Sequence, residues 1–239
     1  MPVKNTQSAI LYDDVNRMVM NHGADLFGIA GIERFNDAPK GFHPTDIYIK
    51  TRSVIVFAKR LPTGSLFAES CVPYTHANTL IMHEVDRMTL AIASDLEAIG
   101  INTVIIPTDD PYEWWDEGSK TGRAILSLRH AAQLAGLGII GRNNLLVNDR
   151  FGNMIQIGAL LTDTEINQSP LAGYKTCPPN CRICIDSCPA KALNGTTVEQ
   201  QLCRPLSIYR NEKGYILKKC YECRKRCPLA LGLKNYVNR

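Results

Sequence analysis

Apolar residues in the first 165 positions recur at two spacings, one typical of helices and the other typical of strands. Helical spacing covers residues 8–22 and 79–99, which end at Gly23 and Gly100. A third helix is predicted over residues 123–135. Short apolar or β-branched runs predict strands at residues 26–30, 53–57, 103–106 and 155–161. Helices that alternate with strands predict a layered α/β domain over residues 1–165.

Two segments of this domain show neither spacing. Residues 61–78 are predicted to be irregular, and residues 108–122 are predicted to form a long loop. Loops of that length in compact domains are often functional. Trp114 and Trp115 are therefore candidates for the wall of a substrate pocket, although one buried and one exposed ring is the commoner arrangement of such a pair.

Eight of the nine cysteines lie between residues 177 and 227. They form two runs that end in Cys-Pro, with Cys203 between them, as in ferredoxins with two iron–sulfur clusters. In that pattern the cysteine before proline binds the other cluster. The predicted ligands of cluster one are Cys177, Cys181, Cys184 and Cys227, and those of cluster two are Cys188, Cys203, Cys220 and Cys223.

Zinc sites and disulfides are the alternative interpretations of these cysteines. Zinc sites usually pair two C-x2-C motifs without a third cysteine and a Cys-Pro ending. Disulfides need an oxidising compartment, and residues 1–14 do not read as a secretory signal. We therefore expect two [4Fe-4S] clusters in a cytoplasmic protein. Cys177 departs from the usual spacing, because three residues separate it from Cys181.

Composition indicates an ordinary globular chain of 239 residues, of which 45% are hydrophobic. No apolar run approaches the ~18 residues of a membrane helix, so no membrane partner is expected. Residues 166–239 are predicted to be a small second domain, folded largely by its metal centres. Residues 175–239 carry 13 Lys and Arg against 4 Asp and Glu. Part of this excess would neutralise the clusters, and the rest would attract either an acidic redox partner or nucleic acid.

Gly136-Leu-Gly138-Ile-Ile-Gly141 matches the G-x-G-x-x-G motif of dinucleotide-binding proteins. That motif follows a strand and opens a helix, whereas here a predicted helix comes first. We therefore reject a dinucleotide site. Gly136 is expected to end the preceding helix, and the glycines allow either a close turn or close approach of a large flat cofactor.

Residues 127–143, SLRHAAQLAGLGIIGRN, together with the downstream cysteines, resemble the epoxyqueuosine reductase family, which is similar to the reductive dehalogenases. The resemblance implies an α+β protein: a nitroreductase-like α/β domain that binds cobalamin, followed by a ferredoxin-like domain with two [4Fe-4S] clusters. Its implied cofactor-binding residues are Ser127, Arg129, His130, Gly136, Leu137, Gly138, Gly141, Arg142 and Asn143.

The chain departs from the family where a general acid is expected. Aligning Arg129 with the family's D-x-x-P-x-x-E-R segment places Gly122 at the aspartate. Asp116 or Glu117 would replace it from the loop, unless they belong to a solvated face. His130 is a candidate proton donor or cofactor contact, and a histidine bonded to backbone is the alternative. Longer family members carry a C-terminal extension for tRNA, which this chain lacks, so we do not expect it to reduce a tRNA base.

The sequence thus predicts an oxidoreductase in which electrons pass through two clusters to a cobalamin-type cofactor or substrate. Its expected donor is a low-potential protein of the ferredoxin or flavodoxin type. The alternative is an electron-transfer protein without a substrate of its own, which would reduce a corrinoid or flavin partner protein.

Overall fold

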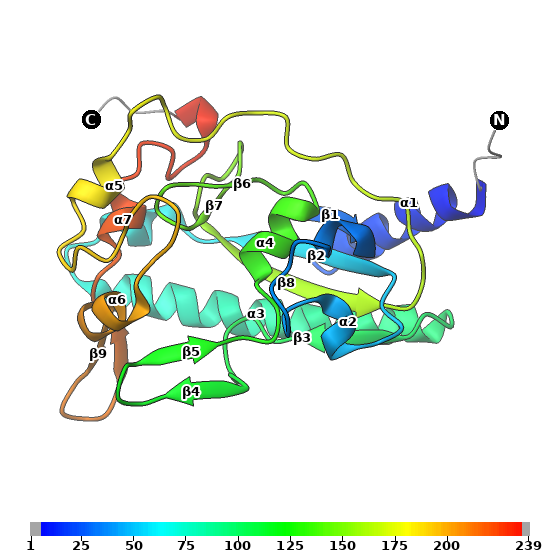
Figure 1. Ribbon diagram of the computed structural model, residues 1–239, viewed down its shortest axis with the longest axis horizontal. Helices are drawn as coiled ribbons and strands as arrows, with labels where there is room; N and C mark the ends of the chain where they lie inside the picture. The colour runs from blue at the N-terminus through cyan, green and yellow to red at the C-terminus, as the bar shows by residue number, and fades with distance from the viewer. Residues whose placement is uncertain (1–5, 236–239) are drawn as a thin grey trace.

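The computed structural model describes residues 6–235, whose centre is a four-stranded sheet with helices on both faces (Figure 1). The strand order is β1 (Leu26–Gly31), β2 (Ser53–Arg60), β8 (Ile155–Thr162) and β3 (Thr103–Ile106). Every neighbouring pair is antiparallel. The four predicted strands are confirmed, but their order gives an antiparallel sheet, as in α+β proteins. Residues 1–5, part of the stretch used to argue for a cytoplasmic protein, lie outside the described residues.

Alternating side chains of the central strands form two cores, one on each face of the sheet. Ile55 and Phe57 pack with helices α1 (Thr6–Asn21) and α3 (Cys71–Ala98). Val54 and Val56 point the other way and pack against α4 (Leu128–Leu134). These strand residues are fully buried, so the sheet is a rigid base for the segments at its edges.

Two helices begin elsewhere than the sequence predicts. The long helix begins at Cys71, eight residues before the predicted start, because the Ser70 hydroxyl caps it by accepting the Val72 N–H. Pro73 lies in its first turn, where a missing N–H costs no helical hydrogen bond. The helix predicted from Arg123 begins only at Leu128. Gly136 ends it as expected, with a φ of 80°.

The predicted loop over residues 108–122 contains a hairpin instead. Strands β4 (Trp114–Asp116) and β5 (Thr121–Arg123) pair antiparallel, with Trp115 opposite Gly122. The strands are three residues long, too short for a clear alternating pattern in the sequence. The hairpin projects beside the end of the sheet that faces the C-terminal segment (Figure 1).

The cysteine-rich segment contains short elements that gather at one end of the sheet domain (Figure 1). Its elements are α5 (Ile183–Asp186), α6 (Gln200–Ser207), β9 (Ile208–Arg210), β10 (Ile216–Lys218), α7 (Glu222–Lys225) and the 3-10 helix η3 (Leu233–Asn235). The remaining elements are η1 (Ile32–Phe35), α2 (Pro44–Ile47), η2 (Thr63–Phe67), β6 (Ile139–Ile140) and β7 (Leu146–Val147). Ile166 still packs in the core beneath α1 and α3. The domain boundary after residue 165 and the ferredoxin-like character of the segment stay predictions.

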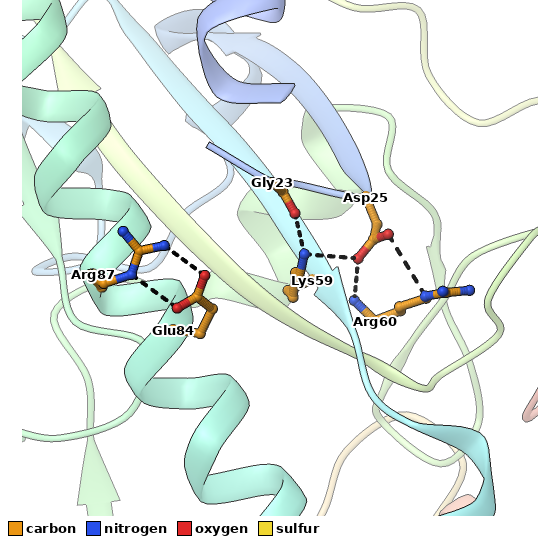
Figure 2. Close-up of polar contacts among 6 residues, drawn as sticks. All are labelled: Gly23, Asp25, Lys59, Arg60, Glu84 and Arg87. Carbon is orange, nitrogen blue, oxygen red and sulfur yellow. Dashed lines mark hydrogen bonds and ion pairs between the residues drawn. The ribbon is translucent and has the colours of Figure 1, made fainter. Parts of the chain in front are cut away.

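A polar network joins the loop between α1 and β1 to the end of β2 (Figure 2). The Lys59 ammonium donates to the Gly23 carbonyl and lies 3.9 Å from an Asp25 carboxylate oxygen. The same carboxylate accepts the Arg60 backbone N–H at 2.9 Å. These contacts join the start of β1 to the end of β2, where Leu26 pairs with Ala58. Within residues 6–235, no helix combines the length and hydrophobicity needed to cross a membrane.

Candidate functional site

Four cysteines predicted to share a cluster surround one small pocket. Cys177, Cys181, Cys184 and Cys227 line it together with Gly141 and Asn143. We call these four cysteines group one. Burial raises the pKa of the Cys227 thiol to about 12, and the other three cysteines of group one add to this rise. The fold thus concentrates four thiols that repel one another once they are ionised, as expected for a site that needs a cationic metal centre.

The other four predicted ligands lie together as well. Cys188, Cys203, Cys220 and Cys223 form group two, and burial raises the pKa of Cys223 to about 11, with the neighbouring thiols of the group contributing to the rise. Cys203 interacts in the same way with Cys188 and Cys220. Cys184 of group one packs in the same small core as Cys188, Cys203 and Cys223. The two groups are therefore neighbours.

The donor set consists of eight thiols, the ligand type that iron–sulfur clusters use. Within residues 6–235, no three His, Cys, Asp or Glu side chains converge closely enough to hold one metal ion. In a [4Fe-4S] cluster each thiolate binds a different iron, so its ligands stand further apart. Eight thiols in two groups of four provide what two such clusters require.

The turn after α4 lies against these cysteines. The Arg142 backbone N–H donates to the Cys177 sulfur at 3.3 Å, and the Arg142 guanidinium donates to the Cys181 carbonyl at 2.6 Å. The Asn143 side chain donates to the Cys223 carbonyl at 3.2 Å, so it links the turn to group two. Hydrogen bonds to cluster sulfurs tune their reduction potentials.

The first part of the glycine motif packs against the protein's own chain. A Cβ atom on Gly136 would overlap the Pro170 carbonyl, and one on Gly138 would lie 2.6 Å from the Val147 carbonyl. Leu137 is buried in the core beneath α4. Cofactor binding by these residues stays a prediction, while the packing explains the two glycines by close approach of backbone.

A cavity of about 590 Å³ lies beside the start of α4, between β8, the β4–β5 hairpin and α6. Ser127 and Arg129, both predicted cofactor contacts, line it. Cys203 of group two also lines the cavity. Among the described residues, no cysteine of group one does. Group two is therefore the thiol group that adjoins the cavity.

The cavity wall contains buried polar atoms that lack partners. They are the Arg129 Nε, the Asn144 Nδ2, the Thr108 Oγ1 and both polar side-chain atoms of Asn153. Burial without a carboxylate partner lowers the pKa of Arg129. An unsatisfied buried polar group costs about 1–3 kcal/mol. Such atoms fit a ligand with many amide groups, and the corrin ring of cobalamin carries amide side chains around its edge.

Among residues 6–235, Tyr112 is the one tyrosine that lines this cavity. Its hydroxyl donates to an Asp109 carboxylate oxygen at 2.9 Å and accepts from the Arg204 guanidinium at 3.3 Å. Burial and the Asp109 charge raise the pKa of Tyr112. Tyr112 therefore keeps its proton at neutral pH, as a proton donor to a bound ligand must.

Two kinds of reductase are similar to this chain in sequence. No family model matches the chain. An epoxyqueuosine reductase from Staphylococcus aureus is 26% identical over 233 residues, which is 83% of this chain and 56% of that protein. A tetrachloroethene reductive dehalogenase from Dehalobacter restrictus is 30% identical over 198 residues, or 80% of this chain and 31% of the relative.

Solved structures of both kinds of enzyme share the fold. The epoxyqueuosine reductase of Streptococcus thermophilus matches 93% of this chain and 67% of its own, with a TM-score of 0.66 at 17% identity. A reductive dehalogenase described as performing B12-dependent dehalogenation matches 96% of this chain and 33% of its own, with a TM-score of 0.66 at 18% identity. The curated relatives and structural neighbours of both kinds support an epoxyqueuosine reductase-like family member. It spans about half the length of the curated epoxyqueuosine reductase and a third of the dehalogenase.

Gly122, which the resemblance aligns with an aspartate, lies on the cavity wall against Tyr112. A Cβ atom on Gly122 would lie 3.0 Å from the Tyr112 ring and 3.0 Å from the Trp115 ring. The tyrosine thus lies where a larger residue would place its side chain. The ring of Tyr112, whose hydroxyl carries an ionisable proton, therefore packs directly against position 122.

The candidate acids named from the sequence lie elsewhere. Hydrogen bonds from Ser119 lower the pKa of Asp116, and contacts with Lys120 and Trp115 lower that of Glu117. Both are therefore ionised at neutral pH, and neither lines the cavity. Burial and the Arg129 charge lower the pKa of His130, whose Nδ1 lies 2.7 Å from the Ser127 hydroxyl. That geometry resembles the alternative of a locally satisfied histidine.

Sequence reasoning missed Tyr112, Arg204, Asn144 and Asn153. Arg204 follows a predicted ligand cysteine, and this adjacency was the available signal. Trp114 and Trp115, proposed as pocket walls, are outside the cavity lining but stack on arginines of that lining. Both rings are about equally exposed, at 45% and 40%, because a hairpin at the protein surface holds them.

The raised pKa of Tyr112 makes a prediction that needs no substrate. The phenolate absorbance of the wild type and of the Tyr112→Phe variant is measured during a pH titration. The difference between the two curves reports the ionisation of Tyr112. Because burial penalises the phenolate, we expect the difference to appear only above the ordinary value of about 10. A transition at or below that value would contradict the burial of Tyr112 in the cavity wall.

Proposed function

We propose that the chain is an iron–sulfur oxidoreductase that passes electrons through two [4Fe-4S] clusters to a cobalamin-type cofactor or a substrate in the cavity. The observation that carries this proposal is the position of Cys203, which belongs to group two and lines the cavity. Group one adjoins group two through their shared core. Group one thus adjoins group two, and group two adjoins the cavity.

The relatives support redox chemistry. Both curated relatives are reductases, and one solved neighbour is named for B12-dependent dehalogenation. In such enzymes cobalamin supplies a strongly reducing cobalt centre. In this chain the unpaired donors and acceptors of Arg129, Asn144 and Asn153 would hold the amide-rich edge of the corrinoid.

The chain's own residues provide binding, orientation and a proton. Asn143 and Arg142 position the two cysteine loops against the turn after α4. Tyr112, held between Asp109 and Arg204, keeps a proton on its hydroxyl at the cavity wall. Reduction of a carbon centre to C–H consumes one proton for each electron pair, and Tyr112 is the group placed to supply it.

A spectral titration tests the proposal. The chain is reconstituted anaerobically with iron and sulfide and then titrated with cobalamin. We expect saturable binding of one cobalamin per chain. Absence of any spectral change would overturn the cofactor proposal and would leave an electron-transfer protein that reduces a partner. The donor of the ferredoxin or flavodoxin type and the cytoplasmic location stay predictions.

Asn153→Leu separates cofactor binding from folding. The side-chain amide of Asn153 makes no hydrogen bond to the described residues. Its removal therefore breaks no hydrogen bond in the cofactor-free protein. We expect the stability of the variant in urea to be unchanged or higher. Cobalamin binding should weaken about tenfold, because the loss of one hydrogen bond costs about 1.4 kcal/mol. Asn102→Leu, in which a surface amide pairs with Asp163, is the matched control and should leave binding unchanged. Unchanged binding in Asn153→Leu would place the corrinoid elsewhere.

A further inference from the structure

The cavity carries an excess of positive charge. Its charged wall residues are Asp109 and four arginines: Arg123, Arg129, Arg204 and Arg224. The ion pairs found among residues 6–235 include none of these arginines. A [4Fe-4S] cluster in group two, with a net charge of about −2, would offset only part of the excess. A positively charged cleft with low-dielectric walls concentrates anions.

Two of the arginines are held at the rim by aromatic rings. The Arg204 guanidinium lies 5.4 Å from the Tyr112 ring centre and 4.9 Å from that of Trp115. Arg123 lies in the same way 5.5 Å from Phe42 and 6.0 Å from Trp114. Cation–π contacts occupy the flat faces of a guanidinium and leave its N–H edges for a ligand.

The rim is fixed before a ligand arrives. Gln200 and Gly122 exchange two hydrogen bonds, of 3.2 Å and 3.3 Å, which tie α6 to the β4–β5 hairpin. The Gln200 side chain also accepts from the Arg204 Nε at 3.0 Å. Arg204 uses two of its five N–H groups on Gln200 and Tyr112, so it retains donors for a carboxylate or phosphate.

We propose that the cavity selects an anionic substrate, a small molecule with a carboxylate or phosphate group, and that Arg204 and Arg123 bind this group at the rim. The substrate's other end would then lie towards Tyr112 and the unpaired polar wall. Reduction of this molecule rests on the function proposed above. Its selective binding does not depend on that function.

Benzoate and benzamide form a matched pair of probes, because they differ mainly in charge. Each is titrated by NMR into the iron-reconstituted chain without corrinoid, over the millimolar range. We expect benzoate to bind at least about tenfold more tightly than benzamide, since a hydrogen bond to a charged group contributes more than one to a neutral group. Arg204→Gln should remove this preference, and Arg204→Lys should retain part of it. Arg17→Gln, an exposed α1 arginine paired with Asp14, is the control and should keep the full preference.

Three results would overturn the proposal. The first is equal binding of the two probes, or binding of neither. The second is an unchanged preference in Arg204→Gln, or an equal loss in Arg17→Gln. The third concerns the cofactor, because cobalamin carries a phosphodiester that cobinamide lacks. If Arg204→Gln weakens binding of cobalamin but not of cobinamide, and leaves benzoate binding unchanged, the anion belongs to the cofactor. Failure of the chain to bind any corrinoid would contradict the proposed function and would leave the benzoate result intact.

Discussion

The Cys203→Ala variant is expected to lose about four of about eight irons per chain, because one [4Fe-4S] cluster needs all four thiolates of group two. Metal binding contributes directly to the folding of small metal-dependent segments, so the C-terminal segment should also become sensitive to proteolysis. Since Cys203 is the predicted cluster ligand that lines the cavity, electron delivery to the cavity should stop as well. Iron analysis, limited proteolysis and reduction of bound cobalamin by dithionite measure the three effects.

Cys71→Ala is the matched control for this change. Cys71 is the ninth cysteine, at the first turn of α3 and outside both groups. Its substitution should leave the iron content at about eight. Loss of iron from Cys71→Ala, or full retention in Cys203→Ala, would contradict the assignment of group two.

Gly152→Ala is expected to displace Cys227 of group one, because Gly152 packs against the segment that follows this cysteine. Gly152 has a φ of 60°, and an added Cβ would overlap the carbonyl oxygen of Leu229 and the backbone of Ala230. These residues lie two and three positions after Cys227, and the Asn153 N–H donates to the Ala230 carbonyl at 3.2 Å. Because backbone cannot yield as a flexible side chain can, the segment that carries Cys227 must shift. We expect a loss of stability of about 1–3 kcal/mol from overpacking, added to a backbone cost of about 1–2 kcal/mol for a left-handed residue, and partial loss of iron.

Gly41→Ala isolates the backbone part of this effect. Gly41 has a φ of 85°, but nothing lies within 4 Å of a Cβ added there. The control should therefore lose only about 1–2 kcal/mol and no iron. Urea unfolding and iron content compare the two variants. Equal stability losses, with iron retained in both, would show that the contact with Leu229 and Ala230 does not position Cys227.

The sheet could be predicted from the sequence because each of its strands is an apolar run bounded by turns. Val54 to Phe57 are buried on both faces, and such strands stand out without alternation. The start of α3 could not be found in this way, because Pro73 in the first turn and the polar residues between Thr75 and Thr79 hide the helical pattern. The β4–β5 hairpin was missed since its strands hold three residues each and place both tryptophans at the surface.

The cysteine groups illustrate a different limit. Spacing predicted which thiols would gather, because a cluster-binding loop imposes its own geometry whatever surrounds it. Tyr112 and Arg204 could not be brought together from the sequence, because 92 residues separate them and only the packing of α6 on the hairpin joins them. The position expected to hold the general acid shows the same limit. The sequence places Gly122 there, and only the structure shows that the Tyr112 ring lies beside it.

The central claim is that two neighbouring groups of four thiols hold two iron–sulfur clusters that serve the cavity. Its most direct test is the count of iron and acid-labile sulfide in the wild-type chain after anaerobic reconstitution. Two [4Fe-4S] clusters predict about eight of each per chain. About four of each would mean that only one group binds a cluster, and one or two metal ions without sulfide would contradict the claim.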